Sequence, residues 1–113
     1  MLSLPPTVRI FLSTAPADLR WSFDRLAAIV RESLGEDPLS GHLYVFRNRR
    51  EDRVKILYWD RSGFALWYKR LEEGTFRFPT SDTPCVRVDA ADLALLLEGI
   101  DLRGAPRRKR FRR

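Results

Sequence analysis

Residues 43–70 have the sequence LYVFRNRREDRVKILYWDRSGFALWYKR, and this stretch decides the fold. It holds three runs rich in β-branched and aromatic residues, at residues 43–47, 54–59 and 64–70. The connection at residues 48–53 is polar and charged, whereas DRSG at residues 60–63 has Asp first and Gly last, as a type I turn prefers. The stretch therefore predicts a meander of three antiparallel strands joined by two hairpin loops.

Shorter strands are predicted on both sides of this meander. Val8, Ile10 and Leu12 alternate with other side chains up to the break at Ala15-Pro16, which is the period-two pattern of a strand. Further along the chain, Val-Arg-Val at residues 86–88 predicts another short strand, and Phe-Arg-Phe at residues 76–78 predicts a short edge strand. We expect three to five strands in all.

Two helices are predicted from helical spacing of apolar residues. The first is expected to begin with Asp18 as its N-cap and to end at Gly35, and one stripe of it holds Leu19, Phe23, Leu26, Val30 and Leu34. The second is expected to follow an Asp89 cap, to end near Gly104, and to bury Leu93, Leu96, Leu97 and Ile100. The predicted fold class is α+β, an antiparallel β-meander packed with two helices.

Length and composition limit the domain organisation and the chemistry. With 113 residues, 44% of them hydrophobic and 32% charged, we expect one globular domain over residues 1–104 and a basic tail at residues 105–113 that is disordered when free. No apolar run approaches the roughly 20 residues of a membrane span. A single cysteine, Cys85, cannot form an internal disulfide, and with only His42 beside it a zinc site of three or four nitrogen and sulfur ligands cannot be built. We expect no nucleophilic triad, because the only histidine lies in a predicted loop before a strand. The glycines lack nucleotide-binding spacing. We expect no catalytic residue, no cofactor, no metal and no small-molecule substrate, in a cytoplasmic, nucleoid-associated protein.

Charge is unevenly distributed along the chain. Residues 47–70 carry eight basic and three acidic side chains, residues 71–102 carry two and seven, and residues 103–113 carry seven basic side chains and no acid. Because guanidinium groups suit phosphate oxygens, the two basic segments predict contact with the phosphate backbone of DNA. The candidate DNA-binding residues are Arg47, Arg49, Arg50, Arg53, Lys55, Lys69, Arg70, Arg107, Arg108, Lys109 and Arg110.

Strand alternation divides the meander into two predicted faces. One set holds Leu43, Val45, Ile56, Tyr58, Leu66 and Tyr68, and the other holds Tyr44, Phe46, Lys55, Leu57, Trp59, Trp67 and Lys69. The second set mixes rings with amines, which suits stacking of bases and neutralisation of phosphates in a single strand of nucleic acid. The alternative is that two helices cover the sheet and that Trp59 and Trp67 belong to the core.

The longest phrases of the sequence resemble a known family. VFRNRREDRVKILYWD at residues 45–60 and LWYKRLEEGTF at residues 66–76 closely resemble the TnpB-type accessory proteins of IS66-class bacterial insertion sequences, and the likeness spans nearly the whole chain. The resemblance implies a small bacterial protein that is encoded beside a separate transposase and is needed for efficient transposition without being the recombinase. It implies no established catalytic residue or cofactor. Trp21 is a departure, because the family often has Lys there, and this weakens the expectation that the first helix binds DNA.

Charge and resemblance together predict a non-catalytic accessory protein that binds DNA through the hairpin at residues 47–55 and the tail, and that assists the separate transposase. One alternative is an adaptor that docks on the transposase through acidic residues, namely Glu72, Glu73, Asp89, Asp92, Glu98 and Asp101. A second alternative is a magnesium-dependent nuclease whose carboxylates would be Glu51, Asp52, Asp60 and Glu72.

Overall fold

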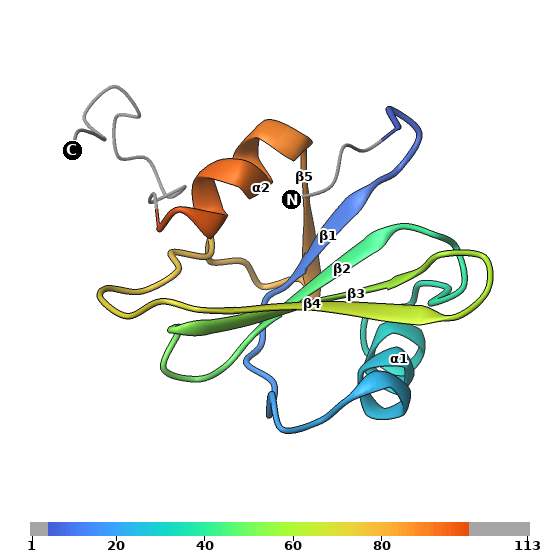
Figure 1. Cartoon of the computed structure of the whole chain (residues 1–113), viewed down its shortest axis with the longest axis horizontal. Coiled ribbons are helices and arrows are strands. Elements are labelled where there is room, and N and C mark those ends of the chain that lie inside the picture. The colour runs from blue at the N-terminus through green and yellow to red at the C-terminus, as the bar shows by residue number, and fades with distance from the viewer. Residues whose placement is uncertain (1–4, 100–113) are drawn as a thin grey trace.

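A single five-stranded sheet carries one helix on each of its faces (Figure 1). The computed structural model describes residues 5–99. Its elements are β1 (Ile10–Ser13), α1 (Phe23–Glu32), β2 (Leu43–Arg47), β3 (Arg53–Trp59), β4 (Phe64–Arg70), β5 (Cys85–Val88) and α2 (Ala90–Leu97). This confirms the predicted α+β class. Within the described residues, neither helix combines the length and the apolar character needed to cross a membrane.

The strand order is β4-β3-β2-β1-β5, so the predicted meander of β2, β3 and β4 is confirmed but makes up only one side of the sheet. Next to it, β1 runs parallel to β2, with Ile10 opposite Leu43, and β5 runs antiparallel to β1. A parallel pair needs a long crossover, and α1 lies in the segment that links β1 to β2. The sheet is therefore mixed, whereas the alternation pattern alone predicted an antiparallel meander.

Each face of the sheet buries its own core against one helix. On one face, strand residues such as Leu12, Val45 and Ile56 pack with Leu93 and Leu96 of α2. On the other face, Phe11, Tyr44, Phe46 and Leu57 pack with Leu26 and Val30 of α1. Figure 1 shows the two helices on opposite sides of the strands. Because both faces are covered, strand residues are apolar on both sides, and this explains the nearly continuous apolar runs in β2 and β3.

The register of β4 corrects the predicted faces. Lys55 lies opposite Tyr68, and Ile56 lies opposite Trp67. Cross-strand partners point to the same face, so Leu66 and Tyr68 lie on the α1 face. Trp67 and Lys69 lie on the α2 face. The prediction placed these side chains on the wrong faces because it continued one alternation from β3 into β4. The loop between the two strands sets which side chains are opposite each other. Trp59 and Trp67 are both partly buried.

Three local predictions about the helices and turns have mixed outcomes. The Asp89 cap of α2 is confirmed, since its carboxylate accepts a hydrogen bond from the backbone N–H of Asp92 at 2.8 Å. Asp18 does not cap α1, which begins after Ser22; its carboxylate binds Arg20 instead. A type I turn at residues 60–63 is wrong, because Arg61 has a positive φ of 82°.

Residues 76–78 also differ from their prediction, because they form no strand. Their aromatic side chains, Phe76 and Phe78, are buried in the core under α2. Their alternation thus comes from packing of an irregular segment and not from strand pairing. Ile100, Gly104 and the predicted domain end and tail lie outside the described residues.

Candidate nucleic-acid interface

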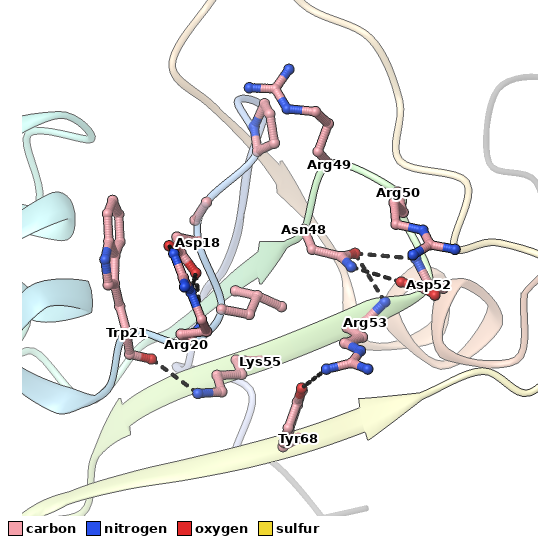
Figure 2. Close-up of a pocket in the computed structure, with 13 residues that line it drawn as sticks. Asp18, Arg20, Trp21, Asn48, Arg49, Arg50, Asp52, Arg53, Lys55 and Tyr68 are labelled. Atoms are coloured by element: carbon pink, nitrogen blue, oxygen red, sulfur yellow. Dashed lines mark hydrogen bonds and ion pairs between the residues drawn. The ribbon is translucent and has the colours of Figure 1, made fainter.

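A groove of about 1020 Å³ opens beside two loops and the strands beneath them. One loop, at residues 16–21, leads into α1, and the other, at residues 48–52, joins β2 to β3. Lys55 of β3 and Tyr68 of β4 lie between them on the α1 face, as Figure 2 shows. We call this feature the basic groove, with Arg49 and Arg50 as its rim and the strand residues Arg53, Lys55 and Tyr68 as its floor.

Cations outnumber acids in the basic groove. It is lined by Arg20, Arg49, Arg50, Arg53 and Lys55 and by only two acids, Asp18 and Asp52. The side chains of Arg49 and Arg50 are exposed and, within residues 5–99, their guanidinium groups make no hydrogen bond or ion pair. The rim therefore presents guanidinium forks that are open to an anion.

Both acids of the basic groove are already held by neighbouring groups. Arg20 donates to the Asp18 carboxylate through Nη2 at 2.6 Å and through its backbone N–H at 3.0 Å, and these hydrogen bonds lower the pKa of Asp18 to about 2. A hydrogen bond from the Asn48 side chain is the main reason that the pKa of Asp52 is lowered. Both carboxylates stay ionised at neutral pH and leave the groove with a net positive charge.

Asn48 organises the loop that carries the rim. Its Oδ1 accepts hydrogen bonds from the backbone N–H groups of Asp52 at 3.1 Å and Arg53 at 3.0 Å, while its Nδ2 donates to Asp52 Oδ1 at 2.6 Å. Glu51 adopts a positive φ of 61°, which closes the turn. Such a side-chain to backbone network suits an asparagine at the start of a turn and holds the rim arginines on a defined backbone.

The floor of the basic groove combines rings with cations. Arg53 Nη1 donates to the Tyr68 hydroxyl at 3.2 Å, and Lys55 Nζ lies 5.0 Å from the centre of the Tyr68 ring. Lys55 also donates to the carbonyl oxygen of Trp21 at 2.9 Å, which ties the floor to the loop before α1. At Trp21 the guanidinium carbon of Arg25 lies 4.5 Å from the ring centre. Tyr68 remains 49% exposed.

Two arginines lie side by side at the end of the β3–β4 hairpin. Arg53 is directly opposite Arg70 in the register, an arrangement that is unfavourable for like charges. Glu72 offsets part of this repulsion, since its carboxylate lies 3.0 Å from Arg70 Nη2. The pair adds to the positive potential of the α1 face near the groove.

Two of the predicted contact residues lie on the opposite face and are bound within the protein. The Arg47 side chain is only 16% exposed; its Nη2 donates to the carbonyl oxygen of Thr14 at 2.8 Å, and its Nη1 is 3.5 Å from Glu51. Lys69 donates to the carbonyl oxygen of Leu97 at 2.8 Å. These two cations make internal contacts and do not line the basic groove. The predicted residues Arg107, Arg108, Lys109 and Arg110 lie outside the described residues.

Sequence reasoning did not place Arg20, Trp21 and Tyr68 in a candidate site. Tyr68 could have been found from the four-residue loop at residues 60–63, because closing it pairs Trp59 with Phe64 and, further along the strands, Lys55 with Tyr68. Arg20 and Trp21 had no such signal, because they are separated from the rim by more than a full helix and strand, and only the packing of α1 brings them there.

The four acids considered for a nuclease do not converge. Asp60 follows β3, while Glu51 and Asp52 precede it, so the strand separates them. Glu51 is engaged by Arg47, and Glu72 is engaged by Arg70. Across residues 5–99, no cluster of three or more His, Cys, Asp or Glu residues is placed to hold a metal ion.

The fold and the groove define a small α+β protein with a cation-lined surface beside an exposed tyrosine ring. The chain belongs to the IS66 Orf2-like family, whose model, described as "IS66 Orf2 like protein", matches residues 8–107. This confirms the family resemblance inferred from the sequence and associates the chain with IS66-class insertion sequences.

Two proteins from Sinorhizobium fredii (strain NBRC 101917 / NGR234) are similar to the chain over most of its length. The uncharacterized protein y4hO is 38% identical over 103 residues, which cover 91% of this chain and 90% of the relative. The uncharacterized protein y4jC is 38% identical over 94 residues, which cover 83% and 80%. No solved structure matches the chain.

Proposed function

We propose that this protein is a non-catalytic accessory protein of IS66-class transposition, and that it binds the phosphate backbone of DNA through the basic groove while assisting the separate transposase. The observation that carries the proposal is the rim, where Arg49 and Arg50 are exposed and uncommitted above a floor that holds Arg53 and Lys55. Membership of the family supplies the connection to transposition.

Phosphate is the anion that best fits this arrangement. Guanidinium forks bind phosphate oxygens with two parallel hydrogen bonds, and a row of cations matches the repeated charge of a nucleic-acid backbone. The backbone of the rim loop is held by Asn48, so on binding the ordering cost falls on the arginine side chains and not on the loop backbone. Arg70, and the tail residues Arg107, Arg108, Lys109 and Arg110, are proposed as further contacts that add affinity without sequence preference.

A salt titration of DNA affinity tests the groove. We compare the full chain with a variant that carries Arg49→Gln, Arg50→Gln and Arg53→Gln, using duplex and single-stranded oligonucleotides. If each arginine neutralises one phosphate, the slope of log affinity against log salt falls by up to about 2.7 on duplex DNA, because one contact contributes about 0.9.

A charge-matched variant provides the control. Arg31→Gln, Arg77→Gln and Arg87→Gln remove the same charge from exposed positions that do not line the basic groove. This control is expected to change the slope by much less. An equal effect of the two triple variants, or an unchanged slope in the groove variant, would reject the groove as the DNA contact. A truncation after Gly104 measures the share of the tail in the same titration.

A further inference from the structure

We infer that the basic groove takes single-stranded DNA in preference to duplex, with one base stacked on the ring of Tyr68 while the phosphates on either side meet the rim. This inference rests on the proposed function and adds to it the form of DNA that the groove recognises.

The side chain of Tyr68 is restrained by neighbouring groups but remains exposed to solvent. It lies on β4, the edge strand of the sheet, and 49% of it is exposed even though it lies over a covered face of the sheet. Its hydroxyl accepts a hydrogen bond from Arg53, and Lys55 Nζ lies 5.0 Å from its ring centre. These two contacts restrain the ring, so a base that stacks on it meets a surface with little orientational freedom to lose.

The cations of the rim and the ring of Tyr68 lie on different parts of the groove, so phosphates and bases can bind at separate positions. Arg49 and Arg50 lie on the loop above, whereas Tyr68 lies on the strand below, as Figure 2 shows. In a duplex the faces of the bases are stacked on one another and only phosphates and base edges are presented. A duplex could therefore use the rim but not the ring. A single strand can turn a base toward the floor while its backbone follows the cations.

The size of the groove agrees with this division. Its volume of about 1020 Å³ is at the upper end of the range of about 300–1,000 Å³ that is typical of small-molecule pockets. It can hold a short piece of flexible chain. Trp21 is only partly exposed, whereas Tyr68 is 49% exposed. Each ring already has a cation over it, Arg25 at Trp21 and Lys55 at Tyr68, so exposure and not the cation distinguishes the two rings. We therefore assign the stacking position to Tyr68 alone.

The first experiment measures binding of the full chain to three probes of equal length by fluorescence anisotropy. The probes are an oligothymidylate, a duplex, and a strand in which abasic sites replace the bases but keep every phosphate. We expect the oligothymidylate to bind more tightly than the other two. Tyr68→Leu is expected to weaken oligothymidylate binding by about 5-fold to 100-fold, in line with the usual effect of removing a stacked ring. It should leave duplex and abasic binding within about two-fold of the parent protein.

Two further variants control for folding and for ring chemistry. Tyr68→Phe keeps the ring and loses only the contact with Arg53, so it is expected to retain most of the preference for the single strand. Phe23→Leu removes another large exposed ring, 41% exposed, that does not line the groove, and is expected to have no effect on any probe. Thermal unfolding of each variant shows whether it is folded.

The outcomes separate failure of the inference from failure of the proposed function. Equal affinity of the parent protein for all three probes, or an oligothymidylate affinity that Tyr68→Leu leaves unchanged, overturns the inference while DNA binding by the rim stands. If the Arg49→Gln, Arg50→Gln, Arg53→Gln variant binds every probe as the parent protein does, the proposed function fails and the inference fails with it.

Discussion

Lys69 on β4 donates a hydrogen bond from Nζ to the carbonyl oxygen of Leu97, the last residue of α2, at 2.8 Å. The last turn of α2 contains no basic residue of its own, so Lys69 supplies a cation to the negative end of the helix dipole from 28 residues away. Its neighbour Tyr68 points to the other face of the sheet and into the basic groove. Adjacent residues of one strand thus serve the fold and the candidate site separately.

Replacing Lys69 by Met is expected to lower the free energy of unfolding by about 1 kcal/mol, because a helix end loses its cation and a carbonyl loses its donor. Urea unfolding measures this change. The salt dependence of DNA binding should stay close to that of the parent protein. Arg77→Met, which removes an exposed cation, is the control and should leave stability nearly unchanged. A normal unfolding midpoint for Lys69→Met, combined with a clear loss of DNA affinity, would contradict the structural role.

Asn48→Ala is expected to destabilise the protein by about 1–2 kcal/mol, because two backbone N–H groups and one carboxylate lose their partner. DNA affinity should fall as well, since the rim arginines lose their fixed backbone. Chemical unfolding and anisotropy measure the two effects. In the other hairpin, Ser62→Ala removes an exposed hydrogen bond to Asp60 and should change neither quantity by much. Full retention of stability by Asn48→Ala would show that water replaces the network.

The same substitution should also alter acid sensitivity. The hydrogen bond from Asn48 lowers the pKa of Asp52 below its ordinary value of 3.8. A lowered pKa in the folded state stabilises the protein above pH 3.8, and this contribution is lost as pH falls through the folded-state value. Asn48→Ala should therefore lose less stability than the parent protein over that acid range, as urea unfolding at several pH values would measure. Identical pH profiles would count against the assignment.

His42 should make the fold weaken on mild acidification. Its Nδ1 accepts a hydrogen bond from the backbone N–H of Arg9 at 2.9 Å, which requires an unprotonated Nδ1, and burial together with the charge of Arg9 lowers its pKa below 6.5. The unfolded chain takes up a proton first as pH falls below 6.5, so stability decreases from there until pH passes the folded-state pKa. In His42→Asn this decrease should be absent, because asparagine does not titrate. Equal slopes of stability against pH in the two proteins would refute the prediction.

Arg70→Thr should raise the stability of the fold and lower its affinity for DNA. The substitution removes the like charge opposite Arg53 and places a good strand former on β4, so at low salt the free energy of unfolding is expected to rise by about 0.2–0.5 kcal/mol. DNA affinity should fall, because a cation near the groove is lost. Both effects should shrink at high salt, where screening is strong. A loss of stability would mean that the ion pair with Glu72 outweighs the repulsion.

Most secondary structure of the described residues follows from local patterns. The bounds of β2 and β4 agree with the predicted runs, β3 begins one residue earlier, and the Asp89 cap marks α2 correctly. Apolar spacing predicted the wrong element where a buried residue lies in a loop or an irregular segment. Leu19 continues the helical spacing but belongs to the loop before α1, and Phe76 and Phe78 alternate without any strand partner. A spacing rule reports which side chains are buried, and it does not report the backbone that buries them.

The sequence by itself determined the class of fold, the family and the clustering of cations around the β2–β3 hairpin, because these depend on residue types and on neighbours along the chain. Only the tertiary structure decided which cations share a surface. It turned Arg47 and Lys69 toward internal carbonyl groups and brought Arg20 into the same groove as Arg49. The sheet register and the packing of α1 set the side to which each strand and loop residue points. Successive side chains of a strand point to opposite faces of the sheet, so neighbours in the sequence can lie on opposite sides of the protein. Distance along the chain does not show which face each residue takes.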